Sequence, residues 1–506
     1  MKKQGKKRIF LKILSAFLVA LGFTGFFSAK WYIEVYGDVG VDSILFTLFG
    51  NNAGVEPGLV INYLLNGLLP AVLVSAVVCF LLLYRGKPYI EFTRKKGGKK
   101  FRIFPFGNTF MVVVSVILCL ALLTHGLFTI DFPQWLKYKG NQTSLYDNEY
   151  IDPEKTTISF PKNKRNLIYI FMESMETTFL SNELGGAMKE NLIPELYTLA
   201  EENTNFSNSK GVGGWEKTTS TSWTIASLVA QTSGITITSD GNEKNPKYGY
   251  IPGTATISDV LSDNGYYQTF MVGSDANFGN RSLYYTQHKT DKIYDLFTAR
   301  ESGIVPKDYY AWWGMEDKYL YKYAKQELTE IAKKNQPFAF SMLTVDTHHV
   351  GGYICSECEN KHGEQYSNVL SCASRQVNEF VEWIKKQDFY ENTTIVIVGD
   401  HPTMDNEYIK KTVPDDYTRR VYNCIINPAI STDNTKDRDF TPMDMFPTTL
   451  AAMGCKISGE RLGLGTNMFS GVPTLVEKLG RDYVCEELRK NSAYYNVNFL
   501  NPERKK

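Results

Sequence analysis

The sequence predicts a two-part protein, in which three membrane-spanning helices are followed by an α/β domain with a mainly parallel central sheet. Two patterns indicate this class. Three long apolar stretches, each near or above the ~20 residues that cross a bilayer, fall within the first 130 residues. Beyond them, short apolar runs of strand length alternate with longer stretches of helical periodicity, as in α/β domains.

The apolar stretches cover residues 10–29, 58–84 and 108–130. A signal peptide followed by buried helices is the alternative, but buried helices seldom run this long without charge. Lysines and arginines cluster before the first stretch and between the second and third, whereas the first connection is acidic on balance. The positive-inside rule therefore predicts a multi-pass membrane protein whose C-terminal part lies on the extracellular side.

These boundaries predict a membrane domain over residues 1–130, a polar linker over 131–165 and an extracellular domain over 166–506. The linker is rich in Tyr, Asp, Lys and Asn, which is typical of an exposed connection. In the third part, the predicted strands are 166–172, 267–272, 338–345, 393–398 and 421–426, and candidate helices include 223–230, 311–334 and 375–386.

The composition fits a folded chain without a nucleic-acid partner. The 506 residues carry 55 Lys and Arg against 54 Asp and Glu, which gives a formal net charge of +1. The chain therefore has no overall excess of positive charge that would attract nucleic acid. Hydrophobic residues make up 43% of the chain, which is enough apolar surface to offset the entropy lost on ordering.

Six of the eight cysteines fall in the predicted extracellular part, where disulfides persist. Cys355 and Cys358 form a Cys-x-x-Cys pair that would suit zinc, but no second pair follows at zinc-finger spacing. We therefore expect a local disulfide between Cys372 and one member of this pair, with metal binding as the alternative.

Acidic and imidazole side chains follow three of the predicted strands. Glu173 comes after the first, His348 and His349 after the third, and Asp400 with His401 after the fourth. Because ligands bind beyond the carboxyl ends of strands in open sheets, these groups are predicted to gather on one rim and to suit a divalent cation. A single carboxylate could simply cap a helix, so the prediction depends on the whole set.

A glycine-rich segment, residues 211–223, ends in a cluster of threonines and serines before an apolar helix. Backbone amides at a helix N-terminus can receive a phosphate, and a metal-bound threonine can attack phosphorus. Hydroxyl clusters are also common helix caps, so this segment alone is a weak signal.

Taken together, these residues resemble the alkaline phosphatase-like phosphoglycerol transferases, a family that includes lipoteichoic acid synthase and the transferase that decorates periplasmic glucans. The resemblance covers most of residues 166–470 and implies a sulfatase-like catalytic domain on the outside of a bacterial cell membrane. The matching strings are Asn166 to Ser174, Glu216 to Thr218, Thr344 to His349, Gly399 to His401, Asp444 to Thr448 and Arg461 to Thr466.

The resemblance also implies one divalent cation, manganese first and magnesium as the alternative. The implied ligands are Glu173, Thr218, Asp400 and His401. Thr218 is implied to be the nucleophile as well, in preference to Thr219 and Thr221, because Lys217 precedes it as in the family pattern.

Substrate contacts are implied for Arg281, His348, His349 and Lys217. Gly279 and Val272 depart from the lipoteichoic acid synthase pattern, which favours the glucan-modifying branch.

The implied reaction moves phosphoglycerol from phosphatidylglycerol in the membrane to an envelope polysaccharide or teichoic acid, through a covalent threonine intermediate. A phosphoethanolamine transferase of the same superfamily is one alternative. A catalytically inactive lipid or glycan sensor is another. A sulfatase is disfavoured, because no Cys/Ser-x-Pro-x-Arg string occurs near residue 218.

Overall fold

The computed structural model describes residues 2–37, 40–49, 57–83, 90–93, 100–103, 108–238, 244–245 and 249–501. The chain forms two compact units, of which unit 1 is Met1–Asp38 with Glu56–Gln134 and unit 2 is Val39–Val55 with Trp135–Lys506. This division differs from the one expected from the sequence. Of the segment between the first two apolar helices, the described residues 40–49 fold with unit 2.

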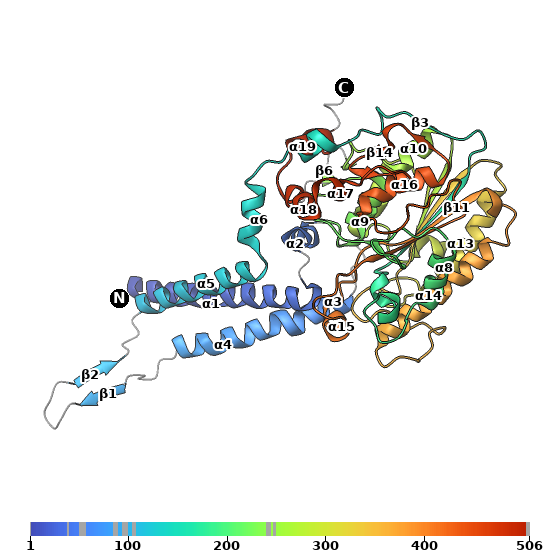
Figure 1. Cartoon of the computed structure of the whole chain (residues 1–506). Helices are drawn as coiled ribbons and strands as arrows, with labels where there is room; N and C mark the ends of the chain where they lie inside the picture. Colours follow the sequence, from blue (N-terminus) through green and yellow to red (C-terminus); the bar gives the residue numbers. More distant parts are fainter. Residues whose placement is uncertain are drawn as a thin grey trace. The chain divides into compact units, whose positions relative to one another are not determined.

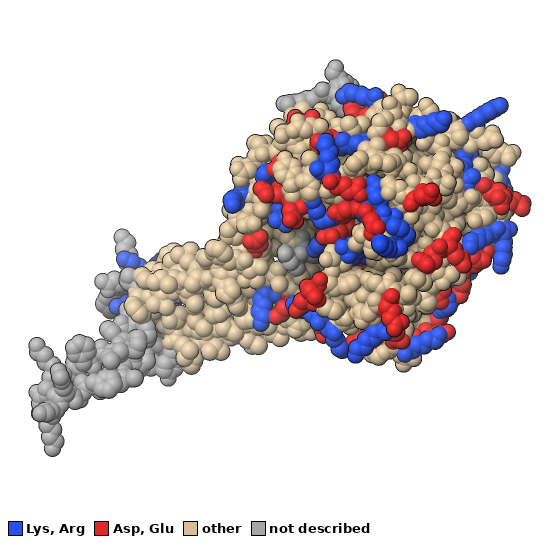
Figure 2. Space-filling model, viewed as in Figure 1, with Lys and Arg blue, Asp and Glu red and all other residues tan. Residues whose placement is uncertain are grey.

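Unit 1 contains three helices long and apolar enough to cross a membrane, Lys6–Tyr36, Pro57–Leu82 and Phe110–Thr129, as the sequence predicted. The visible face of this helical unit carries almost no charged side chains, whereas both signs are interspersed over unit 2 (Figure 2). Most of the basic connection between the second and third helices lies outside the described residues. The elements are α1 (Lys2–Tyr36), α3 (Pro57–Asn62), the π-helix η1 (Tyr63–Leu68), α4 (Leu69–Leu83), α5 (Asn108–Thr129) and the hairpin β1 (Ile90–Thr93) with β2 (Lys100–Ile103).

A seven-stranded sheet forms the centre of unit 2, in the order β5-β12-β11-β4-β10-β8-β9. Strands β11, β4, β10, β8 and β9 are mutually parallel, while β12 is antiparallel to β11, so the sheet is mainly parallel, as predicted. The strands are β4 (Asn166–Met172), β5 (Gly214–Trp215), β8 (Tyr267–Val272), β9 (Lys292–Tyr294), β10 (Phe338–Leu343), β11 (Thr393–Gly399) and β12 (Val421–Ile426).

Helices cover both faces of this sheet (Figure 1). Along β4, Ile168 and Ile170 join the core formed with α8 (Pro194–Glu202), α13 (Asp317–Ala332) and α14 (Gln365–Ile384). Tyr169 points to the opposite face, where its hydroxyl donates to Gln231 of α9 (Thr224–Ser233) at 3.1 Å. β4 is therefore buried on both faces, which explains its unbroken apolar sequence.

The predicted linker is partly folded onto unit 2. Its helix α7 (Leu145–Glu149) carries Tyr146, whose ring centroid lies 5.7 Å from that of Tyr495 and 5.6 Å from that of Phe499. The remaining helices of unit 2 are α2 (Gly40–Phe49), α10 (Ile257–Asp263), α11 (Arg281–Gln287), α12 (Leu296–Glu301), α15 (Asn406–Thr412), α16 (Met445–Ala452), α17 (Leu475–Leu479), α18 (Arg481–Arg489) and α19 (Ala493–Asn498), and α6 (Phe132–Lys139) runs across the boundary between the units.

The pairing of β5 with β12 gives a stability prediction. A Cβ atom at Gly214 would lie 1.7 Å from the carbonyl oxygen of Val421, so Gly214→Ala forces the two strands apart. Overpacking of this kind costs about 1–3 kcal/mol, and the thermal unfolding midpoint should fall. Gly211→Ala is the matched control, because its Cβ would meet no described atom within 4 Å. Equal midpoints for the two variants would contradict the close approach.

Candidate active site

The register of the two central strands places two acidic residues side by side. β4 and β11 are parallel, and Met172 pairs with Gly399 at their carboxyl ends. The next residue on each strand is a carboxylate, Glu173 and Asp400. Gly399 is needed at this point, because a Cβ there would lie 2.0 Å from the carbonyl oxygen of Met175.

Glu173, Asp400 and His401 form one buried cluster. His401 Nε2 lies 3.6 Å from Glu173 Oε1 and 3.4 Å from Asp400 Oδ2. Asp400 Oδ1 accepts hydrogen bonds from the backbone amides of Ser174 and His401, each at 2.7 Å. The structure thus brings together three of the four predicted metal ligands, although they are far apart in the sequence.

Burial shifts the pKa of both carboxyl groups upward. Desolvation, followed by the nearby charge of Asp400, raises the pKa of Glu173 to about 8. Desolvation likewise raises the pKa of Asp400 to about 7. Each shift reflects the cost of holding a negative charge away from water with insufficient positive charge beside it.

The side chains of this cluster fit a divalent cation. Asp400 Oδ2 is buried and has no hydrogen-bond partner among the described residues. His401 Nδ1 lies 2.9 Å from the carbonyl oxygen of Pro402, an arrangement that assigns the proton to Nδ1 and leaves the Nε2 lone pair facing the carboxylates. Carboxylate oxygens with one imidazole suit manganese or magnesium better than a soft metal ion, which prefers thiolate ligands.

The threonine with hydrogen-bond contacts to the cluster is Thr224, whereas the sequence pattern predicted Thr218. Thr224 Oγ1 lies 3.4 Å from Glu173 Oε2 and 3.3 Å from His401 Nε2. Thr218 Oγ1 instead lies 3.5 Å from Thr221 Oγ1, and no hydrogen bond joins Thr218 to the cluster in the described part of the chain. Thr224 is the first residue of α9 and is half-buried.

The sequence analysis did not single out Thr224, because it took the Lys217-Thr218 pair as the guide to the nucleophile. The start of the apolar helix is a second pattern that points to a hydroxyl. The hydroxyl at a helix N-terminus has unpaired backbone amides beside it, which can receive the oxygens of a phosphate.

Arg281 is buried beside this cluster. Its Nη2 donates to Ser274 Oγ at 2.9 Å and to the carbonyl oxygen of Asp275 at 2.8 Å. Desolvation lowers the pKa of Arg281 to about 10, opposed first by the charge of Glu173. Arg281 therefore stays cationic at neutral pH, and its Nε has no hydrogen-bond partner among the described residues.

The two predicted histidines lie on the loop that follows β10. The His348 ring is 4.5 Å from the Trp313 ring and 4.4 Å from the His349 ring, centroid to centroid. Burial, then the charge of His401, lowers the pKa of His349 to about 3. Burial and the charge of His349 hold the pKa of His348 well below its usual value, so both imidazoles are neutral at pH 7. Lys217, in contrast, is exposed.

Helix α2 is a second feature that the sequence did not reveal. Asp42 of α2 accepts hydrogen bonds from Trp135 Nε1 at 2.8 Å and from Ser220 Oγ at 3.2 Å. The ring of Phe46 lies 5.8 Å from that of Trp223, the residue before Thr224. A helix between two predicted spans thus supports the loop that leads to Thr224.

Residues 165–455, more than half of the chain, match the sulfatase family. The chain belongs to this family. Its membership confirms the family expected from the sequence strings, but a fold of this kind hosts several reactions.

Curated relatives of this sulfatase-family chain are phosphoglycerol transferases I. The enzyme of Xanthomonas axonopodis pv. citri is 30% identical over 300 residues, which cover 56% of this chain and 41% of the relative. That of Escherichia coli is 28% identical over 330 residues, covering 64% of this chain and 41% of the relative. The chain thus spans about two fifths of the length of these relatives.

Two solved structures share the fold. The lipoteichoic acid synthase LtaP from Listeria monocytogenes aligns with a TM-score of 0.50 and 21% identity, covering 62% of this chain and 79% of that chain. The lipooligosaccharide phosphoethanolamine transferase A from Neisseria meningitidis, an integral membrane protein, aligns with a TM-score of 0.51 and 12% identity, covering 88% of this chain and 84% of that chain. At these identities the likeness supports the architecture of the sulfatase-family chain and not its substrate.

The raised carboxyl pKa values give a pH-dependent prediction. In the cation-free protein, Glu173 and Asp400 keep their protons up to about 8 and about 7, whereas the unfolded chain loses its own near the ordinary value of about 4. The unfolded state therefore binds fewer protons between about pH 4 and pH 8, so the stability of the cation-free protein falls as the pH rises.

A bound cation removes this penalty, so the gain in unfolding temperature from manganese over EDTA should be larger at pH 8.5 than at pH 5.5. Differential scanning fluorimetry measures it. Glu173→Gln, which cannot ionise, is the control and should show a smaller pH dependence. A manganese increment that is the same at both pH values in the wild-type protein would contradict the assignment.

Proposed function

We propose that the protein is a membrane-anchored phosphoglycerol transferase. It takes phosphoglycerol from phosphatidylglycerol and passes it to an envelope polysaccharide or teichoic acid, through a covalent intermediate on Thr224. The observation that carries the proposal is the position of the Thr224 hydroxyl, 3.3 Å from His401 Nε2 and 3.4 Å from Glu173 Oε2, at the N-terminus of α9. The names of the curated relatives supply the class of group transferred.

In the first step, Thr224 Oγ forms a bond to phosphorus and the bond between phosphorus and the diacylglycerol oxygen breaks. Glu173, Thr224, Asp400 and His401 would hold a divalent cation, manganese by preference, which supplies the charge that lowers the pKa of the hydroxyl. The amides at the start of α9 bind the phosphate oxygens, where negative charge develops.

The proton leaving Thr224 must reach the diacylglycerol oxygen. We assign this proton transfer to the imidazoles of His348 and His349, on the loop that follows β10. Arg281 keeps a positive charge beside the phosphate. In the second step an acceptor hydroxyl forms the new bond to phosphorus, the bond between phosphorus and Thr224 Oγ breaks, and the proton of the acceptor hydroxyl passes to Thr224 Oγ.

Replacement of the threonines tests the nucleophile. Thr224→Ala should lower manganese-dependent release of diacylglycerol from labelled phosphatidylglycerol by on the order of a thousandfold or more, because the attacking atom is removed. Thr218→Ala is the matched control and should keep most of the activity, since among the described residues the Thr218 hydroxyl contacts that of Thr221 and none in the cluster. Mass spectrometry of the wild-type protein should locate the phosphoglycerol adduct on the peptide that contains Thr224.

The same assay decides among the alternatives. Release from phosphatidylethanolamine in place of phosphatidylglycerol would favour a phosphoethanolamine transferase. Inactivity of the wild-type protein with both lipids, while manganese still binds, would favour a sensor. An inactive Thr218→Ala protein beside an active Thr224→Ala protein would overturn the assignment of the nucleophile.

We also propose that unit 2 faces the outside of the cell. The support is the distribution of lysine and arginine around the three apolar helices. Protease added to intact spheroplasts should therefore digest unit 2, while a cytoplasmic marker protein stays whole. Protection of unit 2 until the spheroplasts are lysed would reverse the orientation.

A further inference from the structure

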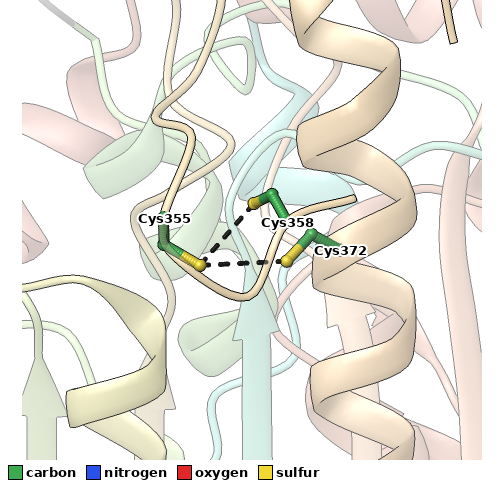
Figure 3. Close-up of side chains that lie close together, drawn as sticks. All are labelled: Cys355, Cys358 and Cys372. Atoms are coloured by element: carbon green, nitrogen blue, oxygen red, sulfur yellow. Dashed lines mark hydrogen bonds between the residues drawn. The ribbon is translucent and has the colours of Figure 1, made fainter. Parts of the chain in front are cut away.

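Three cysteines meet at a point on unit 2 that the proposed reaction does not use. Cys355 and Cys358 lie on the loop between β10 and α14, and Cys372 lies in α14. The Sγ atom of Cys355 points toward the other two, at 3.6 Å from Cys358 Sγ and 3.9 Å from Cys372 Sγ (Figure 3). All three sulfur atoms lie within 4.8 Å of one another.

These distances do not agree with the disulfide expected from the sequence. A disulfide joins sulfurs about 2.0 Å apart, and all eight cysteines of the chain are free thiols in the structure. Around tetrahedral zinc, with zinc–sulfur bonds of about 2.3 Å, neighbouring sulfurs lie about 3.8 Å apart. The two distances from Cys355 fall on either side of this value.

We propose that Cys355, Cys358 and Cys372 bind one zinc ion as thiolates. The surrounding groups suit sulfur atoms that carry negative charge. The backbone amide of Glu357 donates to Cys355 Sγ at 3.4 Å, and Gln376 Nε2 donates to the same atom at 3.6 Å. Donors of this kind around a metal ligand fix its orientation and disperse its charge.

Positive charge is also available at this position. Three thiolates and one zinc ion leave one net negative charge, and the Arg375 guanidinium approaches to 3.6 Å between Nη2 and Cys372 Sγ. Lys318 Nζ donates to Ser356 Oγ at 2.8 Å, on the loop between the two cysteines. Cys355 and Cys372 are buried whereas Cys358 is half-buried, so an ion can enter from the side of Cys358 and keep a water molecule as its fourth ligand.

The zinc ion would hold the loop that carries His348 and His349 against α14. That loop runs from the end of β10 to the start of α14, and Cys355 lies six residues after His349. The site is separate from the Glu173 cluster, and its existence does not depend on the proposed transferase reaction.

Cobalt substitution of the full-length protein in detergent tests this site. Cobalt bound by thiolates shows a near-ultraviolet charge-transfer band, which a site made of carboxylates, a hydroxyl and one imidazole lacks, so the readout distinguishes the two candidate metal sites. The wild-type protein, purified without oxygen, should show this band and should lose it when zinc is added in excess, because zinc displaces cobalt.

Cys358→Ser is the test variant, because Cys358 is the least buried of the three cysteines and its replacement disturbs packing least. It should lose the band and bind about one zinc ion fewer per chain by elemental analysis. Cys485→Ser, which changes a cysteine outside the cluster, should keep both. The absence of the band in the wild-type protein, or a disulfide-linked peptide joining any two of the three cysteines, would overturn the proposal.

Discussion

Two carboxylates buried side by side are the constraint on which the site depends. Glu173 and Asp400 are adjacent because β4 and β11 pair in a register that aligns Met172 with Gly399. Both are removed from water, so their ionised forms need positive charge nearby. Arg281 uses its Nη2 on Ser274 and Asp275, and forms no ion pair with either acid among the described contacts. Protonation removes this charge in the cation-free protein, and a divalent cation beside Glu173, Asp400 and His401 would balance it in the ionised state.

Much of this arrangement could be predicted from the sequence. The apolar runs 166–172, 267–272 and 421–426 have the bounds of β4, β8 and β12, because a strand buried on both faces has a continuous apolar sequence and few alternatives. The rule that ligands bind beyond the carboxyl ends of parallel strands then identifies Glu173, Asp400 and His401 without any coordinates. For these strands and strand ends, the pattern of the local sequence agrees with the tertiary structure.

The threonine that contacts the cluster, Thr224, could not be predicted in the same way. Five of the six residues from Thr218 to Trp223 carry hydroxyl groups, and Thr224 adds a sixth hydroxyl. Which of them reaches the cluster depends on where α9 begins and on the turn at Ser220, whose φ of 57° is unusual for a residue with a side chain. These features are set by tertiary contacts that leave no periodic pattern in the sequence. The first part of α14 was missed for a similar reason, because the predicted helix began at residue 375. The residues before it include Ser, Asn and Cys, which favour helix weakly, and packing against the rest of the core stabilises them.

Helix α2 belongs to unit 2, although it precedes two of the three long apolar helices in the sequence. A boundary drawn from the apolar stretches, at residue 130 or 165, separates α2 from the fold to which it belongs. A protein cut there would lack the carboxylate of Asp42, which accepts from Ser220, and the ring of Phe46, which lies beside Trp223. Both contacts are to the segment that positions Thr224. The loop before Thr224 is therefore contacted by a part of the chain from which two predicted membrane spans separate it in the sequence. A fragment cut at residue 130 or 165 would lack these contacts.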